Sequence, residues 1–175
     1  RVWQEFGRGL LEEHPGRMFD ALERCDFRPK LLPELKEIPK TFSGPLAVRF
    51  AVLCRPLQES GIEALCDRLR VPNEERDLAL LACRLRASLD ASRPGDLLNL
   101  LKRGDAIRRP ERFGAMLEVA RIGQPGLDTT KIERALAAAA AVDAGAVARS
   151  APTPAEIPVL IDQARERAIA AALSG

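Results

Sequence analysis

Apolar residues recur at helical spacing in almost every segment of this chain, and this period limits the folds open to it. In residues 1–13, Val2, Trp3, Phe6 and Leu10 fall on one side of a helix, as expected for an amphipathic helix that buries one face. No segment shows convincingly the strict alternation of apolar and polar residues that predicts a half-buried β-strand. The sequence therefore predicts an all-α fold.

Prolines mark where several of these helices begin. Pro94 and Pro110 stand at the start of the expected helices 94–103 and 110–122, since proline is tolerated in the first turn of a helix. The apolar run 46–53 is compatible by itself with a buried strand or a buried helix. Its helical neighbours favour a helix.

Capping residues predict two further helix starts. Asn73 is placed to cap a helix over 73–89, whose first turn carries acidic residues that favour the helix dipole. Thr153 and Glu156 have the spacing of a capping box and predict a last helix over 156–173.

The composition is that of a globular chain with few catalytic groups. The 175 residues are 46% hydrophobic and 30% charged, which excludes a disordered chain. No apolar run approaches the roughly 20 residues of a membrane-spanning helix, so we expect no membrane contact. The single histidine, His14, is expected in an exposed turn and supports neither a metal site nor a catalytic triad. The chain begins at Arg1 within an expected helix, so we expect it to be part of a longer protein.

The cysteines lie far apart and form no Cys-x-x-Cys pair. Their apolar helical contexts predict reduced, buried thiols in a cytoplasmic protein. The adjacent acid pairs at 12–13 and 74–75 are expected on solvated helix faces, because neighbouring side chains diverge on a helix. The cysteines are Cys25, Cys54, Cys66 and Cys83.

Basic residues gather around one expected helix-to-helix turn. The formal net charge of +2 is too small to indicate a nucleic-acid partner, but most cations are arginines, whose planar fork matches phosphate. Backbone N–H groups point outward at the start of a helix, which also favours phosphate. The alternative is an ordinary solvated face. The candidate residues are Lys102, Arg103, Arg108, Arg109 and Arg112, with Arg70 in a weaker second patch.

A series of motifs occurs in a defined order along the chain. They are RVWQEF (1–6), LLPEL (31–35), RFAVLC (49–54), LCDRLRVPNEERDLA (65–79) and DAIRRPERF (105–113). Together they resemble the region that follows the catalytic head of bacterial CCA-adding enzymes, the tRNA nucleotidyltransferases. The resemblance is specific to about residue 122 and loose beyond it.

The resemblance implies three parts within this chain. Residues 1–45 correspond to neck and body helices, residues 46–122 to a helical domain of the HD phosphohydrolase type, and residues 123–175 to a C-terminal tail. The family's catalytic head lies N-terminal in the same polypeptide and uses Mg with ATP and CTP. This fragment has no Asp-x-Asp pair, so we expect it to be non-catalytic alone and to hold no cofactor.

The HD pattern of the family, Leu-Cys-His-Asp-Leu-Gly-Lys-Gly, is broken here. Cys54 is followed by Arg55 and Pro56, and Arg86 stands near the position of a later histidine. A guanidinium repels a divalent cation, and proline offers no side-chain ligand. The resemblance therefore implies a degenerate HD scaffold without a metal site.

These observations predict the tRNA-binding C-terminal part of a tRNA nucleotidyltransferase. It would hold the acceptor arm and elbow of tRNA through phosphate contacts while the head adds the 3′-terminal CCA. Two alternatives stay open: a stand-alone helical interaction module, and a metal-dependent phosphohydrolase of the HD type.

Overall fold

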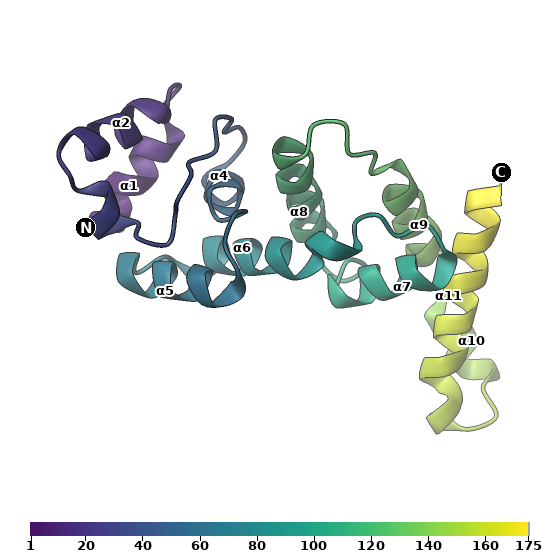
Figure 1. Cartoon of the computed structure of the whole chain (residues 1–175). Helices are drawn as coiled ribbons and strands as arrows, with labels where there is room; N and C mark the ends of the chain where they lie inside the picture. The colour runs from purple at the N-terminus through teal and green to yellow at the C-terminus, as the bar shows by residue number, and fades with distance from the viewer. Residues whose placement is uncertain (175) are drawn as a thin grey trace. The chain divides into compact units, whose positions relative to one another are not determined.

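The computed structural model describes residues 1–174, which form helices and loops and contain no β-strand. The predicted all-α fold is confirmed. The chain divides into two compact units, both visible in Figure 1. Unit 1 comprises Arg1–Arg86 and Gly114–Leu127, and unit 2 comprises Ala87–Phe113 and the chain from Asp128 onward. The three parts implied by the family resemblance follow other boundaries and stay a prediction.

Unit 1 is organised around an apolar helix. Its helices are α1 (Val2–Leu11), α2 (Gly16–Arg24), α3 (Arg28–Leu31), α4 (Leu46–Leu53), α5 (Glu59–Leu69), α6 (Asn73–Leu85) and most of α8 (Pro110–Gly123). The helix α4 packs against α1 and α6 and buries Phe50 and Leu53 completely. Trp3 of α1 meets the Phe50 ring edge to face, with the ring centroids 5.2 Å apart. This geometry is the favoured one for an aromatic pair, and it fixes α1 on α4.

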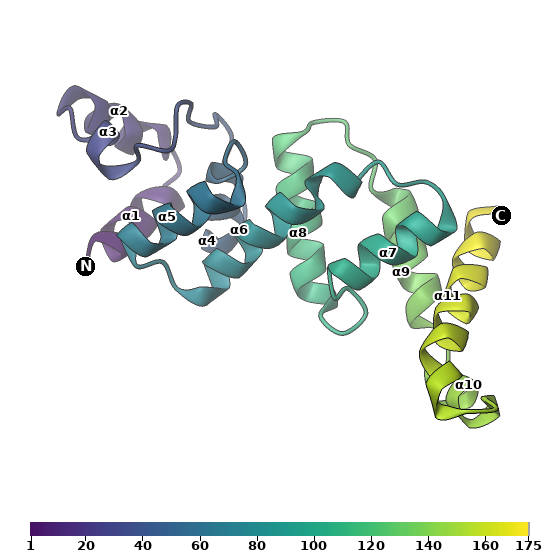
Figure 2. The same ribbon diagram turned by 60° about the horizontal axis from the view of Figure 1, so that its bottom comes forward.

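Unit 2 is organised around the C-terminal helix. Its elements are α7 (Pro94–Arg103), α9 (Thr130–Ala140), α10 (Ala144–Ser150), η2 (Pro154–Glu156) and α11 (Ile157–Ser174), preceded by most of η1 (Arg86–Ser88). The helix α11 packs against α7, α9 and α10, and it lies beside α9 in both views (Figures 1 and 2). Ala135 and Ala139 of α9 are completely buried together with Ile169 of α11. Small side chains on α9 therefore allow the two helices to approach closely.

The predicted helix boundaries hold best where proline sets them. The helices expected over 46–53 and 94–103 have these bounds in the structure, and the helix expected over 110–122 ends one residue later. The predicted cap at Asn73 is wrong, because Asn73 is the first residue inside α6, after Pro72. Thr153 takes the N-cap position of η2 as predicted, but its hydroxyl donates to the Glu156 carboxylate at 2.7 Å instead of accepting from the backbone.

Several burial predictions also need correction. Cys25 is exposed, because α2 ends there and its side chain has no element to cover it; Cys54 and Cys66 are buried as predicted. Glu75 is buried although a solvated position was expected, since it shares its side of α6 with core residues. Val2 is 56% exposed and lies outside the core. His14 is exposed in a turn, as predicted.

Candidate nucleic-acid interface

The turn between α7 and α8 has a defined backbone conformation. The N–H of Ala106 donates to the Leu101 carbonyl at 2.9 Å, and the N–H of Asp105 donates to the Lys102 carbonyl at 3.1 Å. This pair of bonds ends a helix in a Schellman motif, which needs a left-handed residue between them. Asp105 takes that position with φ of 53°, and aspartate tolerates it better than most side chains. Ala106 is completely buried, so the turn is anchored to the core of unit 2.

One carboxylate lies at the centre of the basic residues on this turn. The Arg108 guanidinium donates to Asp105 Oδ2 at 2.9 Å from Nε and 2.7 Å from Nη2. Arg109 Nε lies 3.6 Å from the same oxygen. The Arg108 hydrogen bonds hold the pKa of Asp105 below its ordinary range, so this carboxyl group is ionised at neutral pH.

A cleft of about 310 Å³ opens beside the turn in unit 2. Lys102, Arg108 and Arg165 supply its cationic side chains, and Asp105 is the only carboxylate among the residues that line it. Arg165 comes from α11, and its buried Nε has no hydrogen-bond partner in the described chain. We call this feature the basic cleft. Its remaining lining residues are Leu101, Ala106 and Ile107.

The structure brings most of the predicted site residues to this region. Lys102 lies in the basic cleft and forms an ion pair with Asp162 of α11. Arg103 lies on the last turn of α7 and donates to Ser88 Oγ at 3.0 Å. Arg112 follows Arg108 by one helical turn, and its buried Nε has no hydrogen-bond partner within residues 1–174.

Arg70, the sixth predicted residue, belongs to unit 1. It follows α5 with φ of 55° and is exposed. It takes the left-handed position of another Schellman ending, because the N–H of Val71 donates to the Cys66 carbonyl at 2.9 Å. Its backbone role accounts for its conformation, and no lining residue of the basic cleft comes from this loop.

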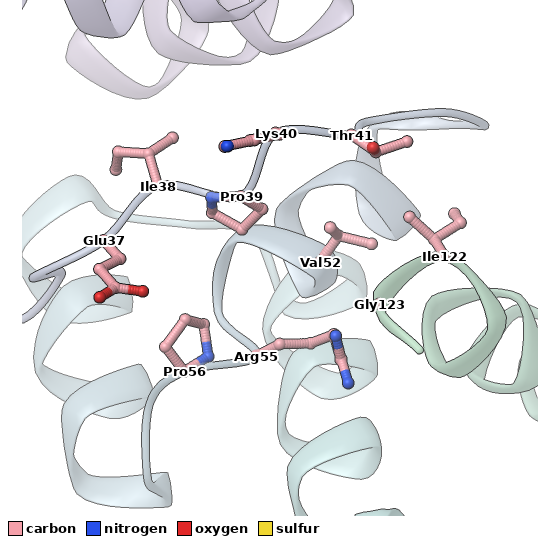
Figure 3. Close-up of a pocket in the computed structure, with 10 residues that line it drawn as sticks. All are labelled: Glu37, Ile38, Pro39, Lys40, Thr41, Val52, Arg55, Pro56, Ile122 and Gly123. Atoms are coloured by element: carbon pink, nitrogen blue, oxygen red, sulfur yellow. The ribbon is translucent and has the colours of Figure 1, made fainter. Parts of the chain in front are cut away.

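A pocket of about 430 Å³ in unit 1 is drawn in Figure 3. It is lined by Arg55 and Pro56, two of the positions at which the family resemblance implies a broken HD pattern. The third, Arg86, is not among the lining residues and donates a hydrogen bond to the Arg55 carbonyl. No group of three or more His, Cys, Asp or Glu side chains in the described residues is placed to hold a metal ion. The side chains here therefore do not fit a metal centre.

Comparison with known proteins decides the relationship. The multifunctional CCA protein of Paraburkholderia phymatum is 34% identical over 231 residues, which cover 99% of this chain and 55% of that protein. Those of Aromatoleum aromaticum and Burkholderia pseudomallei are each 35% identical and cover 98% and 99% of the chain. The chain is homologous to part of the multifunctional CCA proteins. The predicted relationship to the CCA-adding family is confirmed.

The chain spans about half the length of the curated CCA proteins it matches. The match to the Paraburkholderia CCA protein extends over 231 residues, whereas this chain has 175, so that relative has segments inside the matched region that this chain lacks. No family model matches the chain. No solved structure matches it either.

Sequence reasoning missed Arg165 of this CCA homologue. Arg165 lies far along the chain from the basic turn and has no spacing relationship to it. Only the packing of α11 on α7 brings Arg165 close to the basic turn. None of the helices in the described part of the chain is long and apolar enough to cross a membrane.

Proposed function

We propose that this chain is the tRNA-binding, C-terminal part of a CCA-adding nucleotidyltransferase. The observation that carries the proposal is the basic cleft, which is lined by the three cations Lys102, Arg108 and Arg165 and by one carboxylate. The relatives are named multifunctional CCA proteins. The resemblance to CCA-adding enzymes implies a substrate that is the 3′ end of tRNA. A folded RNA is therefore the polyanion that this cleft would bind.

The side chains of the cleft are better suited to bind phosphate groups than to recognise individual bases. Guanidinium groups form forked hydrogen bonds to phosphate oxygens, and folded RNA is recognised largely by its shape and by phosphate position. Arg112 and Arg165 each have a buried Nε without a partner in the described chain, so no hydrogen bond of this Nε fixes either guanidinium group. Binding of this kind is tolerant of sequence and weakens steeply with salt.

The chemistry of the whole enzyme would belong to a head in the same polypeptide. Mg with ATP and CTP would act there, because the described residues of this chain hold no suitable group of metal ligands. The chain alone would be non-catalytic. Within it, residues 1–45 would serve as neck and body, 46–122 as a degenerate HD scaffold and 123–175 as tail, in a cytoplasmic protein.

Replacement of Arg165 tests the proposal, because this residue enters the site through the fold alone. We expect Arg165→Gln to weaken binding of tRNA to the whole chain by about tenfold, the lower end of the loss typical of a charge-assisted hydrogen bond. The control is Arg149→Gln on α10, which removes the same charge from an exposed position outside the cleft. Filter binding at several salt concentrations measures both.

The result separates the proposal from its alternatives. If Arg165→Gln and Arg149→Gln lower tRNA affinity by the same small factor, the effect comes from overall charge and not from a specific site. No tRNA binding by the unmodified chain would favour a stand-alone interaction module. Release of phosphate from a phosphomonoester, abolished by a chelator, would favour a metal phosphohydrolase.

A further inference from the structure

The basic cleft of unit 2 takes its cations from three separate stretches of the chain. Lys102 lies in the last turn of α7, Arg108 lies in the turn before α8, and Arg165 comes from α11, which packs against α7 (Figure 1). Two further lining residues, Leu101 and Ala106, are buried in the core of unit 2. The cleft is therefore anchored to the core, and its cations stand on a fixed apolar base.

The volume of the basic cleft limits which part of an RNA can enter it. About 310 Å³ is at the small end of the range of ligand sites. This space holds a phosphate group with its ribose, whereas a base-paired stem is much too wide and can only lie across the opening. Arg165 is half-buried and its Nε is buried, so this guanidinium group belongs to the wall of the cleft. The internal phosphates of a stem stay at the opening, but the end of a strand can enter.

The charge at the cleft matches a dianion better than a monoanion. Four cations and two carboxylates line the cleft or form an ion pair with a lining residue, which leaves a net charge of +2. An internal RNA phosphate is a phosphodiester with a single negative charge. A terminal phosphomonoester carries a charge of about −1.5 to −2 at neutral pH and has three free acceptor oxygens. The charged groups are Lys102, Arg108, Arg109, Arg165, Asp105 and Asp162.

We infer that the basic cleft binds the 5′-terminal phosphate of tRNA and so positions the acceptor arm on this chain. The inference rests on the proposed function, which supplies tRNA as the ligand. No ion pair joins Arg165 to a carboxylate in residues 1–174, so its charge is directed to the phosphate. Lys102 and Arg108 donate with the N–H groups that their carboxylate partners leave free. The half-buried side chain of Ile107 packs against the ribose.

Two forms of one tRNA test the inference. One form carries its 5′ phosphate, and the other is the same RNA after a phosphatase has left a 5′ hydroxyl group. Fluorescence anisotropy, with the label at the 3′ end, measures the affinity of each form for the whole chain at one salt concentration. We expect loss of the terminal phosphate to weaken binding by about tenfold, the lower end of the loss for charge-assisted hydrogen bonds. This comparison needs no protein variant, so it holds even if a variant fails to fold.

Arg165→Gln shows whether the basic cleft is the place where the terminal phosphate binds. The variant should weaken binding of the 5′-phosphate tRNA by about tenfold and leave binding of the 5′-hydroxyl form within about twofold. The charge-matched control is Arg149→Gln, an exposed change on α10, which should lower the affinity of both forms by the same small factor. Circular dichroism confirms that each variant folds.

The outcomes separate this inference from the proposed function. Equal affinities of the two tRNA forms for the unmodified chain, or equal losses for both forms in Arg165→Gln, would overturn the inference and leave the proposed function standing. No binding of either form would overturn both. Isothermal titration with ribose 5-phosphate, the free counterpart of the RNA end, should show far weaker binding than tRNA. Binding as tight as that of tRNA would assign the cleft to a small free phosphomonoester instead.

Discussion

Asp105 and Arg108 form a forked ion pair in the turn between α7 and α8, with Nε and Nη2 of the arginine 2.9 Å and 2.7 Å from the same carboxylate oxygen. A phosphate group bound to Arg108 would need the same N–H donors, Nε and Nη2, that now donate to Asp105. In the proposed interface the carboxylate would therefore compete with RNA for Arg108, and it limits the net positive charge of the basic cleft. This relationship makes the affinity of the cleft adjustable by a single residue.

Asp105→Asn should strengthen tRNA binding by the whole chain. Asparagine keeps the shape of the side chain and tolerates the left-handed backbone at this position, so the turn should persist. The loss of one negative charge should raise affinity several-fold at low salt, and the gain should fade as salt screens it. Filter binding at low and high salt measures the effect. A fall in affinity as large as that of Arg108→Gln would show instead that Asp105 positions the arginine.

Glu34→Gln should lower stability in a pH-dependent way. Arg68 Nη1 donates to Glu34 Oε2 at 2.8 Å, and this hydrogen bonding lowers the pKa of Glu34 from its ordinary value of 4.5. A depressed carboxyl pKa stabilises the folded state above pH 4.5, and this stabilisation is lost as the pH falls through the folded pKa.

The loss of unfolding free energy in Glu34→Gln should thus be about 1 kcal/mol at neutral pH, because the pair is only partly buried, and should approach zero in acid. Urea unfolding of variant and parent at matched pH values measures it. A difference that does not change with pH would contradict the assigned role of the ion pair.

The cysteines should differ sharply in reactivity. Cys25 is exposed, whereas burial raises the pKa of the Cys66 thiol to about 11 and also raises that of Cys54. Since the thiolate is the reactive form, a thiol reagent at pH 8 should label Cys25 first and reach Cys54 and Cys66 only after unfolding. Labelling followed by mass spectrometry, with Cys25→Ser as the control, checks the order. Fast labelling of Cys54 in the folded chain would contradict the packing around α4.

The helices were predictable from sequence where local chemistry determines them. Pro94 sets the start of α7 because proline fits the first turn of a helix, and the apolar run of α4 requires burial on all sides. The short helix α10 was not predicted, since its seven residues carry no long apolar period. Its start depends on the Asp143 side chain, which accepts from the Ala146 N–H at 2.9 Å.

The candidate site was predictable only in part. The clustering of Arg108, Arg109 and Arg112 is visible in the sequence because these residues are neighbours along the chain. Arg165 joins Arg108 in the basic cleft only through helix packing, and the exposure of Cys25 also depends on where other elements lie. Tertiary contacts between distant segments are the information that periodicity and spacing do not contain.

Replacement of both Arg108 and Arg109 by alanine tests the central claim most directly. The account predicts that the whole chain loses affinity about equally for several different tRNAs, and that the slope of the logarithm of affinity against the logarithm of salt concentration becomes shallower by about two, one for each lost phosphate contact. Arg149→Ala should leave both quantities nearly unchanged. Unaltered affinity and slope in the double variant would contradict the account and remove Arg108 and Arg109 from the proposed tRNA-binding surface.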